Sequence, residues 1–290
     1  MSEILNYIAP LSLDDAVKTL ADADVTVFCG GTDLTPQTDA GVRQYASTLM
    51  NIRRVDGLAG IAPGDNKIRI GALTTVSEIM KDQLINEFAP VLVEAADQFA
   101  SDQIRNAASL GGNICNASPA GDMIVPLLVL DAAVELASWH DGAVQTRLIP
   151  LAEFFTAPGK TVKRNNELLT AIIFDKPATS FIACFRKSGP RPALEISTVS
   201  IGIGGNLVDG LFNNVRVAMG SVAPTPLRAR KVEAALEGKP LGVDSIQAAV
   251  ISAGEDATPI TDIRASAWYR DHLVRVFTEE VLNNVLAYRN

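Results

Sequence analysis

The chain has 290 residues, 48% of them hydrophobic and 20% charged, so it is long enough to bury a core and to form two or three domains. Its net charge of −8 argues against DNA or RNA as the main partner, because binding phosphate backbones needs a basic face. No basic segment with a long apolar run opens the chain, and no apolar stretch approaches the roughly 20 residues of a membrane span. We expect a cytoplasmic protein without a membrane span, in which Cys29, Cys115 and Cys184 are unpaired thiols.

The first 55 residues predict a helix, a strand and a glycine-rich turn. Ser12 and Asp15 have the spacing of a capping box, and the apolar residues after them fall on one helical face. Residues 25–29, "VTVFC", are short and rich in β-branched side chains, which predicts a strand. The strand leads directly into Gly30 and Gly31, an order typical of a turn that holds a ligand.

Residues 56–176 predict a second unit of mixed structure. The first predicted elements are a strand at 67–73, a helix capped by Thr75 and Glu78 that ends near Phe88, and, after Pro90, a helix from Val91 to about Ala100. A short helix capped by Asp122 and running through Leu130, a hairpin about Asp141-Gly142 and a strand at 167–174 follow.

The composition changes after Pro177. Segments 181–189, 193–210 and 214–222 predict three long strands joined by tight turns, and therefore a three-stranded antiparallel sheet. Helices are predicted at 226–238, 244–254 and 265–288. Strands followed by helices are typical of an α+β fold. We therefore predict a domain at 1–176, with subdomains at about 1–55 and 56–176, and a second domain at 177–290.

Two segments with paired glycines carry the strongest binding signal. They are "CGGTDLTPQ" at 29–37 and "SLGGNICNASPAGD" at 109–122. Glycine allows backbone N–H groups to approach a ligand closely, and successive N–H groups can form an anion-binding nest. The neighbouring hydroxyl, amide and carboxylate side chains add hydrogen bonds, so such segments can hold a diphosphate without a lysine. From the residues alone, nucleotide binding and two tight structural connections both remain open.

Catalytic and metal-binding groups are scarce in the sequence. No Ser-His-Asp or Cys-His arrangement has a sensible spacing, no CxxC motif is present, and His140 and His272 are remote from each other. We therefore predict no catalytic residue and no metal site on this chain. Any redox chemistry would have to come from a cofactor.

The two glycine segments resemble those of a known family. The first has the family form A-G-G-T-D-L at 29–34, and the second matches S/T-I/L/V-G-G-N-x-x-x-A-S/H-P-x-x-D at 109–122 without gaps. A K-x-x-x-R pattern runs from Lys187 to Arg191, and "GSVAPTPLRAR" at 220–230 is also similar. The chain resembles the FAD-binding medium subunit of the molybdenum hydroxylases, the xanthine dehydrogenase and carbon monoxide dehydrogenase family, over essentially its whole length.

The resemblance implies an α+β protein, with a two-subdomain FAD-binding fold of the PCMH/VAO type before the C-terminal domain. It also implies a set of FAD contacts: Cys29, Gly30, Gly31, Thr32, Asp33, Leu34, Phe99, Ser109, Gly111, Gly112, Asn113, Asn116, Asp122, Leu168 and Lys187.

Three of these positions have specific implied roles, all at the flavin ring. Phe99 matches an aromatic residue that lies against the flavin ring in relatives. Leu168 matches a position whose backbone touches the edge of the ring, and Lys187 matches a lysine near the ring. The alternatives are an ordinary core residue for Phe99 and a solvated strand-end lysine for Lys187. Cys29 stands where a small residue such as alanine is common, and we expect no catalytic role for its thiol.

The implied function is electron transfer within a larger complex. A large subunit would hold molybdopterin, a small subunit would hold two [2Fe-2S] clusters, and FAD on this chain would pass electrons to NAD⁺, a quinone or oxygen. The expected assembly is a dimer of heterotrimers. A self-sufficient flavin oxidase or dehydrogenase and a non-catalytic nucleotide-binding assembly module are the alternatives.

Overall fold

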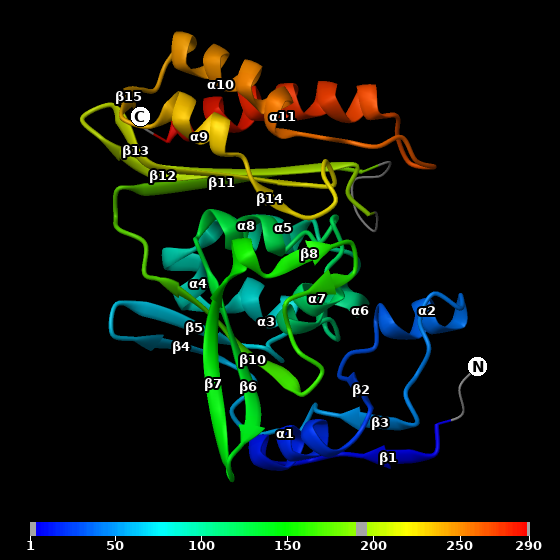
Figure 1. The fold of residues 1–290 in the computed structure, drawn as a ribbon. Coiled ribbons are helices and arrows are strands. Elements are labelled where there is room, and N and C mark those ends of the chain that lie inside the picture. Colours follow the sequence, from blue (N-terminus) through cyan, green and yellow to red (C-terminus); the bar gives the residue numbers. More distant parts are fainter. Residues whose placement is uncertain (1–3, 190–195, 289–290) are drawn as a thin grey trace.

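Three larger sheets organise the chain in the computed structural model, which describes residues 4–189 and 196–288 (Figure 1). The first is a three-stranded parallel sheet of order β1-β3-β2. Its elements and the helices between them are β1 (Asn6–Ile8), α1 (Leu13–Asp22), β2 (Val25–Phe28), α2 (Leu34–Asp39) and β3 (Thr48–Asn51).

Helix α1 begins as the sequence predicts. The Ser12 side chain accepts a hydrogen bond from the Asp15 backbone, and Ala16, Val17 and Leu20 are buried. These residues share a core with Met50 of β3. The same core contains Ala137 and Leu168, so helix α1 joins the first sheet to the next part of the chain.

The second sheet is antiparallel, with the order β4-β5-β10-β6-β7. Its strands are β4 (Ile61–Gly64), β5 (Lys67–Gly71), β6 (Ala133–His140), β7 (Ala143–Pro150) and β10 (Glu167–Asp175). The intervening elements are α3 (Val76–Lys81), α4 (Gln83–Phe88), α5 (Pro90–Asp97), α6 (Asp102–Arg105), α7 (Leu110–Asn116), α8 (Ile124–Val129), a 3-10 turn (Leu151–Glu153), β8 (Phe155–Ala157) and β9 (Lys160–Thr161).

The hairpin at Asp141-Gly142 and the capping box of Thr75 and Glu78 are confirmed, while several helix boundaries differ, among them the end of α5 at Asp97 in place of Ala100. Asp141 has φ 50° and Gly142 φ 81°, as a tight two-residue hairpin requires. The predicted helix to Phe88 is broken at Asp82, whose side chain caps the next helix by accepting from the Ile85 N–H. The predicted cap at Asp122 is wrong, since α8 has Met123 at its N-cap position and no side-chain cap.

The third sheet corrects the prediction of three strands. The three long strands are antiparallel as predicted, but two short strands extend the sheet: β14 follows β13 in the order β11-β12-β13-β14, and β15 also pairs with β13. Its elements are β11 (Phe181–Ser188), β12 (Val199–Val208), β13 (Leu211–Gly220), β14 (Leu227–Arg228), α9 (Arg230–Leu236), β15 (Lys239–Pro240), α10 (Val243–Asp256) and α11 (Ala267–Ala287). Two-residue strands carry no alternating pattern, so the sequence could not reveal them.

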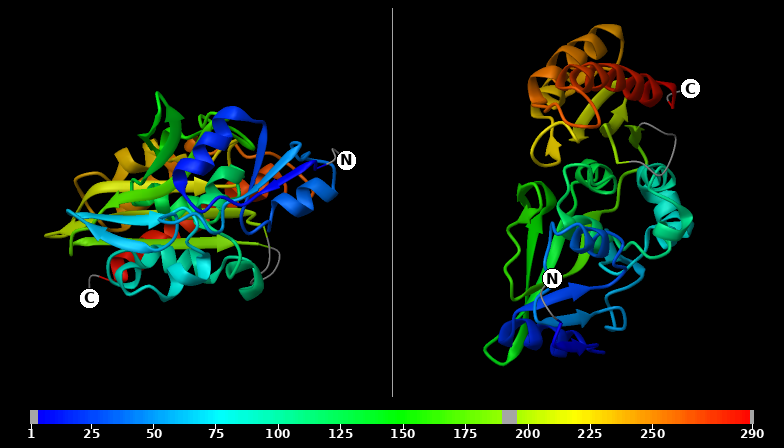
Figure 2. Two further views of the ribbon diagram at one scale, coloured as in Figure 1. Left: turned by 90° about the horizontal axis from the view of Figure 1, so that it is seen from below. Right: turned by 90° about the vertical axis from the view of Figure 1, so that its right-hand side faces the viewer.

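The third sheet lies between two helical layers. Helices α9, α10 and α11 cover one face, and α5 and α8 lie against the other (Figures 1 and 2). Close packing on the α8 side requires glycine in β12, because a Cβ at Gly202 would lie 2.9 Å from a Val129 side-chain carbon.

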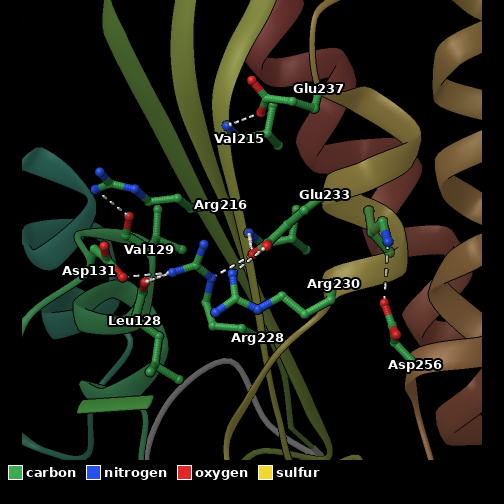
Figure 3. A network of polar contacts seen from close by, with 12 residues as sticks. Leu128, Val129, Asp131, Val215, Arg216, Arg228, Arg230, Glu233, Glu237 and Asp256 are labelled. Atoms are coloured by element: carbon green, nitrogen blue, oxygen red, sulfur yellow. Dashed lines mark hydrogen bonds and ion pairs between the residues drawn. The ribbon is translucent and has the colours of Figure 1, made fainter. Parts of the chain in front are cut away.

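Arginines of the third sheet also reach α8 (Figure 3). Arg228 lies between Glu233, at 2.5 Å, and Asp131, at 2.9 Å, and Arg216 donates to the Val129 carbonyl at 3.4 Å. Polar and apolar contacts thus join the C-terminal sheet to the rest of the chain. No helix in the described ranges is both long and apolar enough to cross a membrane.

Candidate functional site

A cavity lies between three parts of the chain: residues 29–34, which we call the first glycine turn, helix α7 and the start of β10. All the implied FAD contacts line it except Asp122 and Lys187. The lining members are Cys29, Gly30, Gly31, Thr32, Asp33, Leu34, Phe99, Ser109, Gly111, Gly112, Asn113, Asn116 and Leu168. The structure therefore brings together segments that are more than 100 positions apart in the sequence.

The first glycine turn offers backbone donors to this cavity. No described residue accepts a hydrogen bond from the N–H groups of residues 30–34. Gly31 has φ +69°, which glycine adopts without strain. A Cβ at Gly30 would lie 2.0 Å from the Ala107 carbonyl oxygen, so glycine is needed to seat the turn there. Open, consecutive N–H groups of this kind form a nest for an anion.

Residues 110–116 of the second glycine segment form helix α7, where the sequence suggested a loop over 109–122. Ser109 caps α7 by accepting from the Gly112 N–H at 3.1 Å, and its carbonyl accepts from Asn113. The Gly111 N–H donates to the Ala72 carbonyl at 2.8 Å. Because the N–H groups of residues 110–113 already have partners, the open backbone donors at the cavity are those of the first glycine turn. The segment contributes side chains to the cavity instead.

Side chains tie the two glycine segments together. Asn116 donates to the Asp33 carboxylate at 3.0 Å and accepts from the Gln37 amide at 3.0 Å. The Cys29 thiol lies 3.3 Å from the Ser109 hydroxyl. These contacts fix the separation of the turn and the helix, and so the shape of the cavity between them.

Two cations at the cavity have no predictive pattern in the sequence. They are Arg43, in the loop after α2, and Lys163, in the turn before β10. Burial raises the pKa of the Cys115 thiol to about 11, although the positive charges of Lys163 and Arg43 act in the opposite direction. Both cations thus act electrostatically on the same point of the cavity wall. Nothing near either residue in the sequence marks it, because the fold alone brings them together.

The Asn113 side chain leaves one buried acceptor unused. Its Oδ1 atom is buried and has no hydrogen-bond partner among the described residues. Buried polar atoms normally have partners, so an orphan beside a cavity points to a ligand donor such as a hydroxyl or N–H group. The cavity therefore offers a free acceptor on Asn113, open N–H groups at residues 30–34 and two cations. This set of groups fits a dinucleotide with a diphosphate.

The start of β10 forms another part of the wall. Leu168 is buried, and Glu167 beside it accepts two hydrogen bonds from Arg147, at 2.6 and 2.8 Å, and one from the Arg164 N–H at 2.7 Å. Burial raises the pKa of Glu167, but these hydrogen bonds outweigh it and leave the pKa below its ordinary value. The wall is thus held by an ionised carboxylate.

Asp122 and Lys187 lie outside the cavity lining and pair with each other. The Lys187 Nζ atom is 2.6 Å from Asp122 Oδ2, and both side chains are more than nine-tenths buried. Ser197 donates to the other Asp122 oxygen. Burial raises the pKa of Asp122, against the charge and hydrogen bonds of Lys187 and Ser197. Lys187 is therefore not the solvated lysine of the alternative reading, and Arg191, its partner in the sequence motif, lies outside the described residues.

No group of three potential metal ligands occurs within residues 4–189 and 196–288. The three cysteines are free thiols. The polar equipment of the cavity consists of hydrogen-bond donors, acceptors and two cations.

Known families match both halves of the chain. Residues 3–177 match the FAD binding domain in molybdopterin dehydrogenase, and residues 183–285 match the CO dehydrogenase flavoprotein C-terminal domain. The chain belongs to the family of FAD-binding medium subunits of the molybdenum hydroxylases. The resemblance found in the sequence is thereby confirmed, and the protein is an oxidoreductase subunit of a molybdopterin dehydrogenase.

Individual relatives agree with this assignment. The chain is 32% identical to the xanthine dehydrogenase FAD-binding subunit of Escherichia coli O157:H7, over 99% of this chain and 98% of that protein. It is 30% identical to the glyceraldehyde dehydrogenase medium chain of Sulfolobus acidocaldarius, over 97% and 98% of the two chains. Among solved structures, carbon monoxide dehydrogenase from Hydrogenophaga pseudoflava superposes with a TM-score of 0.93 at 27% identity, covering 99% of each chain. The α+β architecture of this medium subunit is thus that of its family.

Proposed function

We propose that the cavity of this medium subunit holds FAD, with the diphosphate against the first glycine turn. The observation that best supports this is that residues 30–34, whose N–H groups have no partner among the described residues, line the same cavity as Arg43 and Lys163. The N–H groups bind phosphate oxygens and the two cations offset their charge. We extend the proposal to the other lining residues that the resemblance implied, but not to Asp122 and Lys187 as direct contacts.

The remaining lining residues orient the cofactor and exclude water. The free Asn113 oxygen accepts a hydrogen bond from a hydroxyl or N–H group of the ligand. Leu168 and Phe99 supply apolar wall. When bound, the flavin supplies redox chemistry that the chain lacks, because it accepts electrons singly and releases them in pairs. The work of this chain is placement and electrostatics.

Membership of the family also supports a wider role. We propose that a partner subunit holds molybdopterin and oxidises the substrate, and that a second partner with two [2Fe-2S] clusters passes the electrons here. NAD⁺, a quinone or oxygen would be the terminal acceptor, and the assembly would be a dimer of heterotrimers. Three free thiols favour a reducing, cytoplasmic location.

The domain division is also a proposal. We place an FAD-binding domain of the PCMH/VAO type at 1–176, with subdomains at about 1–55 and 56–176, and a C-terminal domain at 177–290. The two family matches support this division, because one ends at residue 177 and the other begins at residue 183.

The test is flavin binding by the full chain. We expect the chain, purified or reconstituted with FAD and then gel-filtered, to retain yellow flavin absorbance. FMN, which lacks the diphosphate, should be retained less well. A chain that retains no flavin after reconstitution would falsify the proposal. Reduction of the flavin by a small substrate in the absence of partners would favour a self-sufficient oxidase instead.

A further inference from the structure

A lysine of the C-terminal sheet binds the C-terminal end of helix α5, next to a residue that lines the cavity. Lys187 of β11 donates to the backbone carbonyl of Gln98 at 3.1 Å, in addition to its ion pair with Asp122. Gln98 is the C-cap of α5 and directly precedes Phe99, which lines the cavity. The buried ammonium is thus one residue away from the cavity wall.

The turn that carries Phe99 depends on cations from outside it. Arg105 donates to the Asp97 carbonyl at 2.9 Å and to the Phe99 carbonyl at 2.8 Å. Ala100 has φ +38°, a left-handed conformation that costs energy for a residue with a Cβ. Such a turn persists only when its surroundings determine it. Arg105 holds it from within the first 176 residues, and Lys187 holds it from the C-terminal sheet.

We propose that Lys187 is a positioning residue for the flavin site, which acts by holding the Gln98–Ala100 turn and thereby the Phe99 ring in the cavity wall. This inference rests on the proposed binding of FAD. It gives the C-terminal domain a part in shaping a site that its own residues do not line.

A second contact makes this role separable from simple adhesion between β11 and α5. The Phe185 N–H donates to the Glu94 carboxylate at 2.8 Å, and Phe185 belongs to the core that α5 shares. Phe185 and Lys187 are two positions apart on a strand, so both face α5. Loss of the lysine should therefore release the turn while α5 stays docked.

The variant that tests this must not leave a buried charge unpaired. Removal of Lys187 alone strands the Asp122 carboxylate, and such losses can unfold a protein. The double variant Lys187→Met/Asp122→Asn removes both charges together and also removes the donor to Gln98. The matched control is Arg186→Gln. Arg186 lies beside Lys187 on β11, and its substitution breaks an exposed ion pair with Glu280 of α11.

Two measurements on the full chain report separately on the Gln98–Ala100 turn and on the bound flavin. In the flavin-free chain, amide hydrogen exchange at residues 98–101 should become faster in the double variant and stay unchanged in Arg186→Gln. In the loaded chain, the double variant should show a changed flavin fluorescence and reduction potential, and its FAD dissociation constant should rise on the order of tenfold, the value of one charge-assisted hydrogen bond. Arg105→Gln should produce the same spectral change from the other side of the turn.

A double-mutant cycle with Phe99→Leu decides whether the effect travels through the ring. If Lys187 acts through Phe99, the double variant should change the flavin properties little further in a Phe99→Leu background. An undiminished effect in that background would overturn the inference, as would wild-type exchange at 98–101 in the double variant. Failure of the wild-type chain to bind FAD would instead refute the proposed function, while the exchange experiment would still report on the turn.

Discussion

Asn116 donates a hydrogen bond to Asp33 at 3.0 Å, although the two residues are 83 positions apart in the chain. This contact joins helix α7 to the first glycine turn, and the cavity lies between them. The two glycine segments resemble each other in sequence but do different work. The first provides free backbone donors, and the second provides the side chains that hold the first in place.

Gly30→Ala should displace the first glycine turn and weaken FAD binding. The added Cβ would lie 2.0 Å from the Ala107 carbonyl oxygen, so the turn must move away and disturb the N–H groups of residues 30–34. We expect loss of most bound FAD and a stability loss of about 1–3 kcal/mol, the usual cost of overpacking. Retained flavin absorbance and thermal unfolding measure the two effects.

Gly242→Ala is the control for this change. A Cβ at Gly242 meets nothing within 4 Å, and its φ of −171° is extended backbone that any residue adopts. Its flavin content should equal that of the wild type. Equal flavin content in Gly30→Ala would show that the seating of the turn against Ala107 is unimportant.

Arg43→Gln should weaken FAD binding and reduce its dependence on salt. A cation beside the diphosphate contributes a screened attraction, so affinity should fall by several-fold at low ionic strength and the difference should narrow as salt rises. Titrations of the flavin-free chain with FAD at several salt concentrations measure both. Arg54→Gln removes the same charge from an exposed site outside the cavity and should leave affinity and salt dependence unchanged.

The sequence predicts much of this site, but two of its cations and one of its helices cannot be predicted from local patterns. The glycine segments and caps are local patterns, so the turn at 29–34 and the capping of α1 and α3 followed from neighbouring residues. Arg43 and Lys163 join the cavity only through the tertiary fold. The helix at 110–116 was also missed, because two successive glycines argue against a helix unless outside contacts, here the Ala72 and Thr74 carbonyls, hold its first turn.

Chemical modification should single out Cys29 among the three cysteines. Burial raises the pKa of Cys115 to about 11 and that of Cys184 to about 12, so almost no thiolate forms at either residue near neutral pH. Cys29 and Cys115 are both partly exposed and both line the cavity, so the suppressed ionisation of the Cys115 thiol, and not access, separates them. We expect iodoacetamide to label Cys29 first in the flavin-free chain, and saturating FAD to slow that labelling, as followed by mass spectrometry. Labelling of Cys29 at the same rate with and without FAD would place the cofactor elsewhere.

Glu167→Gln should destabilise the chain at neutral pH and less so in acid. The folded-state pKa of Glu167 lies below its ordinary value of 4.5, so its contribution to stability is fully present above pH 4.5. That contribution is lost as pH falls through the lowered folded-state pKa, because the protonated carboxyl no longer attracts Arg147. Hydrogen bonds to a charged group contribute about 1.5–3 kcal/mol, which sets the expected loss at pH 7.

The pH dependence distinguishes this pair from an ordinary surface pair. Urea unfolding of the wild type and of Glu167→Gln should be measured between pH 3 and pH 8. The difference between their free energies of unfolding should become smaller toward pH 3. Glu255→Gln is the matched control, since its pair with Lys231 is more than half exposed on both sides and should contribute less than about 1 kcal/mol at any pH. A constant difference between the wild type and Glu167→Gln across this range would mean that packing, and not the ionised carboxylate, holds the start of β10 at the cavity wall.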